Sequence, residues 1–238
     1  MTLLKTLLIA LLASLSLAAT AQEATIRKNL AERLPNLPAI EEINKTPIPG
    51  VWEIRINAAE ILYTDSEGNY LIQGSLFDTR NRVDLTEQRI QKLSAVDFKS
   101  LPLKDAVKLV RGKGTRQLAV FEDPNCSFCK RFERDMLKID DVTVHVFLYP
   151  ILGPDSVKKS NDIWCAKDRA KAYLDWMVRN TTPPEASCDT AAVERNVEFG
   201  RKLRVTGTPT IFFVDGTRVP GAIGAERIEA MLKEAQPR

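Results

Sequence analysis

The feature that most constrains this chain is a pair of cysteines three residues apart, Cys126 and Cys129, between a strand-like run and a helix-like run. The apolar run over residues 117–121 ends in a Pro-Asn turn, and the segment after Cys129 has the period of an amphipathic helix. Its expected apolar side is formed by Phe132, Met136 and Leu137. Cys126 therefore lies at the first turn of a helix, where unpaired N–H groups and the helix dipole favour an anion.

A thiolate is the reactive form of cysteine, and a helix start lowers its pKa below the free value of about 8.5. Cys129 lies one turn further on the same side, within reach of a disulfide with Cys126. A zinc site would need four ligands, but the other two cysteines are far apart and His145 is the only histidine. A structural disulfide is disfavoured because so short a ring is strained and easily reduced. Chance spacing is the third alternative. The pattern predicts a thiol–disulfide redox site, without metal or other cofactor.

Residues 1–21 have the three parts of a secretory signal peptide. Lys5 precedes an apolar block, and an A-x-A cleavage site ends at Ala21. The uncharged run over residues 6–22 ends in small and polar residues, which favours cleavage after Ala21 over a permanent membrane span. We expect residues 22–238 to be a soluble, exported chain. Four cysteines, an even number, suit an oxidising compartment.

The charge of the chain gives no sign of a nucleic-acid partner. Its formal net charge is +3 at pH 7, and loss of Lys5 lowers it by one. The 34 basic residues are interspersed with the 31 acidic ones and form no basic stripe. With 44% hydrophobic residues, the chain can bury a core in one or two domains.

The segment 22–82 is predicted to be a small α+β unit. A short helix over residues 23–34 precedes a proline-rich extended stretch, and residues 51–56 alternate apolar and polar side chains as a half-buried strand does. Residues 61–64 and 70–73 flank a hairpin turn, and residues 74–77 extend the second strand. A unit of this size is marginal alone, and its strand edges are available for pairing. A homodimer through this unit is one hypothesis, and packing on the next domain is the other.

A linker helix is predicted within residues 83–104. The sequence Asp84-Leu85-Thr86-Glu87 is an acidic variant of the capping box, and the helix that it opens is charged and only partly amphipathic. This composition is typical of a connector between domains. The remaining residues, 105–238, form the second domain of the predicted architecture.

Within the second domain, residues 142–149 are nearly all β-branched or aromatic, which is typical of a central strand covered on both faces. His145 lies inside this run and is interpreted as a packed or hydrogen-bonded residue rather than a catalyst. Residues 156–178 are predicted to be helical and contain Cys165, whereas Cys188 follows a Pro-Pro loop. A bond between them would close a loop of roughly 24 residues and contribute about 3 kcal/mol, so a structural disulfide is favoured over a second redox pair.

The segment after a further predicted helix, residues 190–203, contains Gly207-Thr208-Pro209 directly before the apolar strand 210–214. Proline cannot donate to a strand ladder, and a cis Thr208–Pro209 bond in a tight turn accounts for its position. Such a turn brings the backbone of Thr208 near the cysteine pair. Two acidic residues before that pair, Glu122 and Asp123, are close enough in sequence to assist proton transfer to Cys129, although solvated surface carboxylates are the favoured interpretation.

These motifs carry a family resemblance. The domain over residues 105–238 resembles a thioredoxin fold, with the C-x-x-C motif at 126–129 and Thr–cis-Pro at 208–209. More narrowly, nearly the whole mature chain resembles the DsbC family of periplasmic disulfide isomerases of Gram-negative bacteria. The matching segments are 61–63, 72–74, 121–126, 163–168, 186–189, 207–209, 216–217 and 219–221. The dipeptide Ser127-Phe128 departs from the glycine or proline followed by tyrosine that family members more often carry, and this departure bears on the reduction potential.

The resemblance implies a V-shaped homodimer whose small N-terminal domains form the base and whose thioredoxin-like domains hold misfolded substrate in an apolar cleft. It implies that Cys126 attacks a wrong disulfide in a secreted protein, that Cys129 resolves a stalled mixed disulfide, and that Thr208 and Pro209 hold the substrate backbone. Such an enzyme must be kept reduced, in this family by a DsbD-like reductase of the inner membrane. It implies a periplasmic location.

Two other functions remain open at this stage. A DsbG-like reductase would rescue single oxidised cysteines, and reactivity toward a sulfenic acid would distinguish it. The chain is alternatively a holdase chaperone, which would suppress aggregation without either cysteine. A dithiol oxidase of DsbA type is less favoured because a dimerisation module is present.

Overall fold

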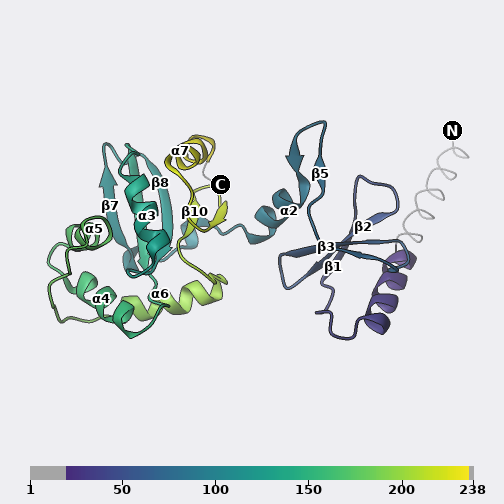
Figure 1. The fold of residues 1–238 in the computed structure, drawn as a ribbon, viewed down its shortest axis with the longest axis horizontal. Helices are drawn as coiled ribbons and strands as arrows, with labels where there is room; N and C mark the ends of the chain where they lie inside the picture. The colour runs from purple at the N-terminus through teal and green to yellow at the C-terminus, as the bar shows by residue number, and fades with distance from the viewer. Residues whose placement is uncertain (1–19, 236–238) are drawn as a thin grey trace, which may run out of the picture. The chain divides into compact units, whose positions relative to one another are not determined.

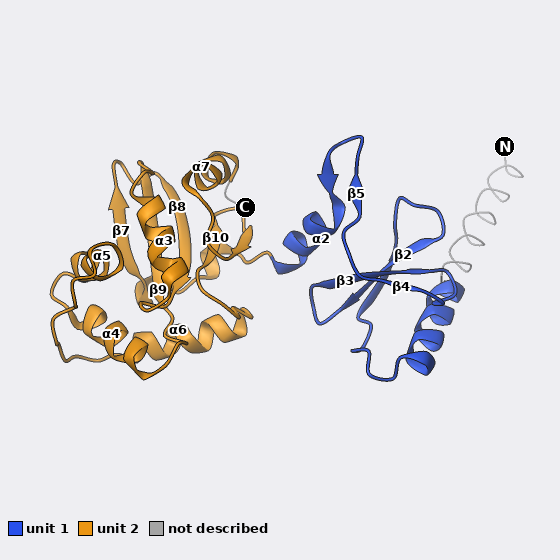
Figure 2. Ribbon diagram, viewed as in Figure 1, with its two compact units in different colours: residues 1–94 blue, residues 95–238 orange. Residues whose placement is uncertain are grey.

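Residues 20–235 are described by a computed structural model, in which the chain divides into two units, residues 1–94 and 95–238 (Figure 2). Residues 1–19 lie outside the described residues, and with them nearly all of the predicted signal peptide. Residues 20–33 are helical, and this range includes the predicted cleavage site after Ala21. In residues 20–235 no helix combines the length and apolar character that crossing a membrane requires.

The first unit contains a four-stranded antiparallel sheet of order β1-β2-β3-β4, a two-stranded ribbon of β5 and β6, and the helix α2 (Figure 1). The elements are β1 Glu42–Lys45, β2 Val51–Ile56, β3 Glu60–Asp65, β4 Leu71–Ile72, β5 Phe77–Asp78, β6 Val83–Asp84 and α2 Leu85–Ser94.

The core of this unit forms as the alternation in β2 predicts. Trp52, Ile54 and Ile56 are buried, while the residues between them are partly exposed. These side chains pack with Ile26 and Leu30 of the helix over residues 20–33. The sheet therefore buries one face against this helix, and the predicted hairpin is present as β3 and β4.

The prediction that residues 74–77 extend the second hairpin strand is wrong. β4 ends at Ile72, and the backbone at Gly74 takes a φ of +158°, after which β5 pairs with β6 rather than with β3. The predicted helix start is confirmed, because the Asp84 carboxylate accepts a hydrogen bond from Glu87 N at 2.9 Å. The following helix, α2, ends at Ser94, the last residue of the first unit.

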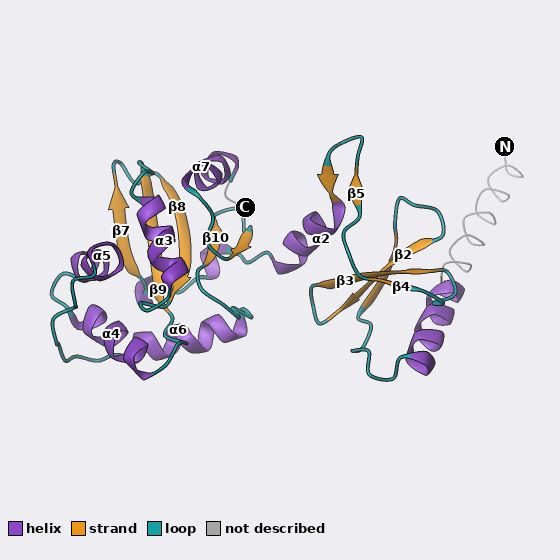
Figure 3. Ribbon diagram, viewed as in Figure 1, coloured by secondary structure: helices purple, strands orange, loops and turns teal. Residues whose placement is uncertain are grey.

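The second unit is built on a mixed five-stranded sheet of order β11-β10-β8-β9-β7, in which only the β8–β9 pair is parallel (Figure 3). Its elements are the 3-10 helices η1 Phe98–Ser100 and η2 Leu103–Asp105, the strands β7 Val107–Arg111, β8 Arg116–Glu122, β9 Val142–Leu148, β10 Thr210–Phe213 and β11 Arg218–Pro220, and the helices α3 Ser127–Met136, α4 Pro154–Cys165, α5 Arg169–Arg179, α6 Ala191–Lys202 and α7 Ala225–Glu234.

Both faces of this sheet are covered, so successive residues of β8 enter different cores. Leu118 and Val120 pack with the inner sides of α3, α5 and α7, whereas Ala119 and Phe121 pack with an aromatic cluster that includes Phe147. Every residue of β9 is buried, which confirms the predicted central strand. The apolar sides of α3 that meet the core are Phe132 and Met136, while Leu137 is 55% exposed, contrary to expectation.

Two further details of the second unit were not predicted from the sequence. The segment 156–178, predicted to be helical, consists of the two helices α4 and α5, and the Asp168 carboxylate caps α5 by accepting from Lys171 N at 2.9 Å. The strand β7 was not predicted, although Val107 and Leu109 alternate with exposed residues on a sheet edge. The central arrangement, a sheet whose β8 ends at the cysteine pair, is as expected.

Candidate active site

The cysteine pair lies where β8 turns into α3. Cys126 is the N-cap of α3: its backbone N–H donates to Asp123 O at 3.0 Å, and its carbonyl accepts from Lys130 N at 3.1 Å. Cys129 lies in the first turn of the same helix and is fully buried, whereas Cys126 retains 7% of its surface. The two thiols are not bonded to each other in this structure. Of the two residues, only Cys126 therefore retains solvent-exposed surface.

The surroundings of Cys126 favour its thiolate. Cys129 N donates to Cys126 Sγ at 3.4 Å. When it carries its proton, the same sulfur donates to Thr208 O at 3.3 Å. A hydrogen bond from the Cys129 thiol, followed by contacts with Thr208 and with the N–H groups of Cys129 and Phe128, lowers the pKa of Cys126 to about 5 against the opposing effect of burial. Most of Cys126 is consequently ionised at neutral pH.

Cys129 has the opposite character. Burial raises its pKa, and so do its hydrogen bond to Cys126 and the negative charge of Glu122. The pair thus consists of one sulfur that is a nucleophile at rest and one that becomes a nucleophile only after losing its proton.

The Gly-Thr-Pro segment lies against the pair, as predicted from the sequence. The Thr208–Pro209 peptide bond is cis, and β10 begins at the next residue, Thr210. The Thr210 hydroxyl donates to Gly207 O at 2.7 Å and closes the turn. The carbonyl of Thr208, the residue before the cis-proline, therefore lies beside the Cys126 sulfur.

The interpretation of Asp123 as a solvated carboxylate is wrong, because its side chain is fully buried. Its Oδ1 accepts from Asn125 N at 2.8 Å and from the Ser156 hydroxyl at 2.7 Å. Its Oδ2 accepts from the backbone N–H groups of Ile151 and Leu152 at 2.7 and 2.9 Å. Asp123 thereby joins the turn before Cys126 to the loop that leads into α4.

Glu122, also interpreted as solvated, is fully buried as well. The Tyr173 hydroxyl contacts its Oε2, and the same hydroxyl lies 3.2 Å from Oε1 of Glu133, another fully buried side chain on α3. Sequence patterns indicate an exposed position for a charged residue next to a turn, and only the tertiary structure places these carboxyl groups in the interior.

Trp176 was missed as a site residue. Its indole N–H donates to Pro124 O at 2.5 Å, two residues before Cys126. Lys130 Nζ lies 3.8 Å and Lys159 Nζ 4.8 Å from the centre of its ring. The tryptophan thus fixes the turn that presents Cys126. A single tryptophan on an amphipathic helix is ordinarily a core residue, so the sequence offered no signal for this role.

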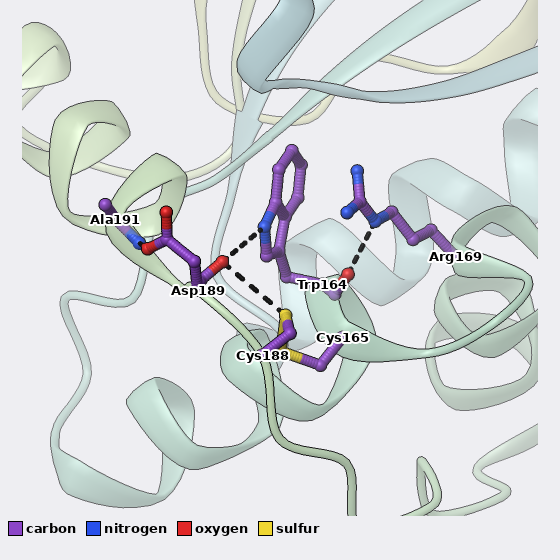
Figure 4. The surroundings of a disulfide bond; sticks show 6 residues. All are labelled: Trp164, Cys165, Arg169, Cys188, Asp189 and Ala191. Carbon is purple, nitrogen blue, oxygen red and sulfur yellow. Dashed lines mark hydrogen bonds between the residues drawn. A yellow bond between two sulfur atoms is a disulfide. The ribbon is translucent and has the colours of Figure 1, made fainter.

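The other two cysteines form a disulfide, Cys165–Cys188, with Cα atoms 5.4 Å apart (Figure 4). The bond joins the end of α4 to the loop before α6, and Cys188 is exposed. Beside it, the Trp164 indole donates to Asp189 O at 3.2 Å, and the Arg169 guanidinium stacks on the Trp164 ring at 3.7 Å. The disulfide therefore belongs to a packed corner of the helical segment.

The described residues contain no cluster of three potential metal-binding side chains. His145 lies inside β9, where its Nε2 is 3.1 Å from Gln117 Oε1, and burial lowers its pKa. It is a packed, hydrogen-bonded residue, as expected from its strand.

A strand, a turn, a C-x-x-C helix start and a cis-proline loop against the same sulfur define a thioredoxin-like thiol–disulfide oxidoreductase domain. Comparison with family models agrees: residues 103–236 match the thioredoxin-like domain, and residues 17–87 match the disulfide bond isomerase protein N-terminal domain. The chain belongs to the DsbC family of thiol:disulfide interchange proteins.

Relatives support this membership over most of the chain. A probable thiol:disulfide interchange protein DsbC from Bordetella parapertussis is 46% identical over 211 residues, which are 89% of this chain and 74% of the relative. The thiol:disulfide interchange protein DsbC of Escherichia coli is 30% identical over 97% of this chain and 95% of the relative. A solved disulfide interchange protein from Neisseria gonorrhoeae matches 58% of this chain and all of its own, with a TM-score of 0.56 and 39% identity.

Proposed function

We propose that this protein is a periplasmic thiol–disulfide isomerase in which Cys126 is the nucleophile and Cys129 the resolving thiol. The observation that carries the proposal is the contrast between the two sulfurs. Cys126 retains exposed surface and a pKa of about 5, whereas Cys129 is sealed and protonated. A stable, accessible thiolate attacks substrate disulfides and is a good leaving group, and both properties favour repeated exchange.

In the proposed cycle the Cys126 thiolate attacks one sulfur of a wrong disulfide, forming a mixed disulfide and releasing the other sulfur as a thiolate. That thiolate attacks a different disulfide in the substrate, which forms a new disulfide and frees another substrate thiolate. The freed thiolate attacks the substrate sulfur of the mixed disulfide, a second substrate disulfide forms, and Cys126 leaves as the unchanged thiolate. If exchange stalls, Cys129 displaces the substrate and the pair becomes oxidised. Re-reduction then requires a dithiol donor, for which we propose a DsbD-like reductase of the inner membrane.

Apolar side chains around the site fit an unfolded protein as substrate. Phe128, two residues after Cys126, is 61% exposed, and Leu152, whose N–H donates to Asp123, is 58% exposed. Pro209 and Thr208 O provide an edge for an extended chain beside the sulfur. The same apolar surface favours holdase activity as a second function, which the double C126A/C129A variant would retain in an aggregation assay.

The experiment that tests the enzymatic proposal is refolding of a scrambled disulfide protein. Cys126→Ala should abolish reactivation, because no other free thiolate is available at the site. Cys129→Ala should retain part of the isomerase activity while trapping mixed disulfides, which non-reducing electrophoresis detects. Reactivation by Cys126→Ala at the wild-type rate would contradict the proposal, and preferential reduction of a sulfenic acid would favour the DsbG-like alternative.

We further propose that the protein is a homodimer through the N-terminal unit. β4 is an edge strand of its sheet, and apolar residues near it are exposed: Tyr70 by 71%, Ile72 by 51% and Phe77 by 53%. An apolar sheet edge of this kind pairs readily with a second copy. Ile72→Asp should halve the mass measured by light scattering, whereas Glu67→Gln in the neighbouring turn should not. A persistent dimer in Ile72→Asp would exclude this edge as the interface.

A further inference from the structure

Trp176 contacts the chain on both sides of the cysteine pair. Its indole N–H donates to Pro124 O, two residues before Cys126, at 2.5 Å. Its ring lies beside the ammonium group of Lys130, the residue after Cys129, with 3.8 Å between Nζ and the ring centre. Because Trp176 belongs to α5, a side chain from a segment distant in sequence joins the two flanks of the C-x-x-C motif.

The peptide group between Pro124 and Asn125 is hydrogen-bonded at both of its polar atoms. Its carbonyl accepts from the Trp176 indole, and its N–H donates to Asp123 Oδ1 at 2.8 Å. Pro124 is buried, and a buried carbonyl that loses its donor costs free energy. The orientation of this peptide group therefore depends on Trp176 as well as on Asp123, and it sets the direction in which the chain enters Cys126.

Lys130 belongs to the first turn of α3. Its N–H donates to Cys126 O at 3.1 Å, which is the first hydrogen bond of the helix. Its ammonium group donates to Asn180 Oδ1 at 2.8 Å, and Asn180 is the C-cap of α5. Trp176 and Asn180 are four residues apart and contact the same ammonium group through a ring and an amide oxygen. The first turn of α3 is thereby joined to the end of α5.

The helix α4 completes a closed series of contacts around the same turn. Asn125 Nδ2 donates to Asp155 Oδ2 at 2.7 Å, and Asp155 forms an ion pair with Lys159. Lys159 Nζ lies 4.8 Å from the centre of the Trp176 ring, whose N–H donates to Pro124. Each of these contacts is weak alone. Together, side chains of α3 and α4 restrain the indole in the position from which it donates to Pro124.

The Cys126 thiolate depends on the same helix start. After the hydrogen bond from the Cys129 thiol, the N–H groups of Cys129 and Phe128 are among the contacts that lower the pKa of Cys126 to about 5. A hydrogen bond from an N–H group weakens steeply when the donor moves away or tilts. Ionisation of Cys126 therefore requires the turn before it and the first turn of α3 to keep their relative position.

We propose that Trp176 is a positioning residue of the active site, which holds these two segments so that the N–H groups of the helix start stay directed at the Cys126 sulfur. This inference rests on the proposed function, in which the Cys126 thiolate is the nucleophile. Trp176 acts through Pro124 and Lys130 rather than on the substrate. Loss of the indole N–H should therefore leave the fold and both cysteines in place but make the thiolate harder to form.

The test is a titration of the Cys126 thiolate in Trp176→Phe, which keeps an aromatic ring beside the lysines but lacks the N–H. The ultraviolet absorbance of the reduced protein, minus that of the matching Cys126→Ser protein, gives the ionised fraction of Cys126 at each pH. The midpoint should rise from about 5 in the wild type to about 6. At pH 5 the ionised fraction should fall about fivefold, whereas at pH 8 it should be nearly complete in both proteins.

Trp52→Phe is the matched control. Trp52 also has a lysine beside its ring, with 5.6 Å from Lys45 Nζ to the ring centre, but it is buried in the core of the first unit. Trp52→Phe should therefore titrate as the wild type does. A role of Trp176 in packing alone would lower the melting temperature of Trp176→Phe and leave the Cys126 midpoint unchanged. That result would overturn the inference and leave the proposed function intact.

Asn180→Gly tests the other flank with the indole in place. It removes the acceptor of Lys130 Nζ but keeps the charge of Lys130, and glycine tolerates the φ of 54° that Asn180 adopts. The midpoint should rise by about half as much as in Trp176→Phe. If Trp176→Phe does not fold, as judged by circular dichroism, an unchanged midpoint in Asn180→Gly would overturn the inference. A wild-type midpoint near the ordinary thiol value of about 8.5 would instead overturn the proposed function.

Discussion

The second unit contains two cysteine pairs, and solvent exposure alone would not show which of them is reactive. Cys126 and Cys129 are buried yet unbonded, while Cys188 is exposed and bonded to Cys165. What separates the pairs is the immediate environment of the sulfur. Cys126 receives hydrogen bonds at a helix start, which stabilise its charge, whereas the disulfide closes a long loop at a packed corner. The reactivity of a cysteine therefore depends on how well its surroundings stabilise the thiolate. The contribution of a disulfide to the free energy of unfolding depends on the length of the loop that it closes.

The largest effect is expected when the second pair, Cys165 and Cys188, is removed. In Cys165→Ser/Cys188→Ser the free energy of unfolding should fall by about 3 kcal/mol, because a loop spanning 23 residues regains its freedom in the unfolded chain. The melting temperature of this unit should fall by about 10 °C. Calorimetry measures the change, with Ser187→Ala in the same exposed loop as control. Isomerase activity at 25 °C should survive, and its loss together with intact folding would assign the pair a redox role.

The second prediction concerns pH and the first pair. The folded-state pKa of Cys126, about 5, lies below the ordinary value of about 8.5. Its thiolate therefore stabilises the reduced fold fully above pH 8.5, and this contribution is lost as the pH falls through 5. Relative to Cys126→Ser, the reduced protein should lose about 2 kcal/mol of unfolding free energy between pH 7 and pH 5. Urea unfolding of both proteins measures the difference, and a difference that does not vary with pH would contradict the depressed pKa.

The third prediction tests the reactivity of the same sulfur. At pH 6 Cys126 is mostly thiolate, a fraction roughly 300 times that of an ordinary thiol. Its lower basicity reduces its intrinsic nucleophilicity by a factor of about 40. Alkylation by iodoacetamide should therefore be on the order of tenfold faster than that of glutathione, with a midpoint near pH 5. Mass spectrometry locates the label. Equal rates, or a midpoint near 8.5, would show an ordinary thiol.

The sequence predicted the redox pair because its signals are local. A strand, a turn and a helix start are encoded in neighbouring residues, and the Gly-Thr-Pro turn is a short motif as well. The buried carboxyl groups of Glu122 and Asp123 were misjudged because their partners, such as Tyr173 and Leu152, come from distant segments. Trp176 was missed for the same reason. Burial and hydrogen bonding across the fold are tertiary properties that no local pattern contains.

The division of segment 156–178 into two helices leads to the smallest predicted effect. Arg169, the first residue of α5, donates to Trp164 O at 2.5 Å and stacks on the Trp164 ring (Figure 4). It therefore stabilises the corner between α4 and α5, where the disulfide also lies. Arg169→Ala should lower the free energy of unfolding by only about 0.5–1 kcal/mol, because the disulfide still holds the corner. The urea midpoint measures this shift, with Lys167→Ala in the break between the helices as control. In the background lacking Cys165 and Cys188 the same substitution should be more harmful, since the corner has then lost its covalent restraint. Equal effects in both backgrounds would mean that the arginine and the disulfide stabilise the corner independently.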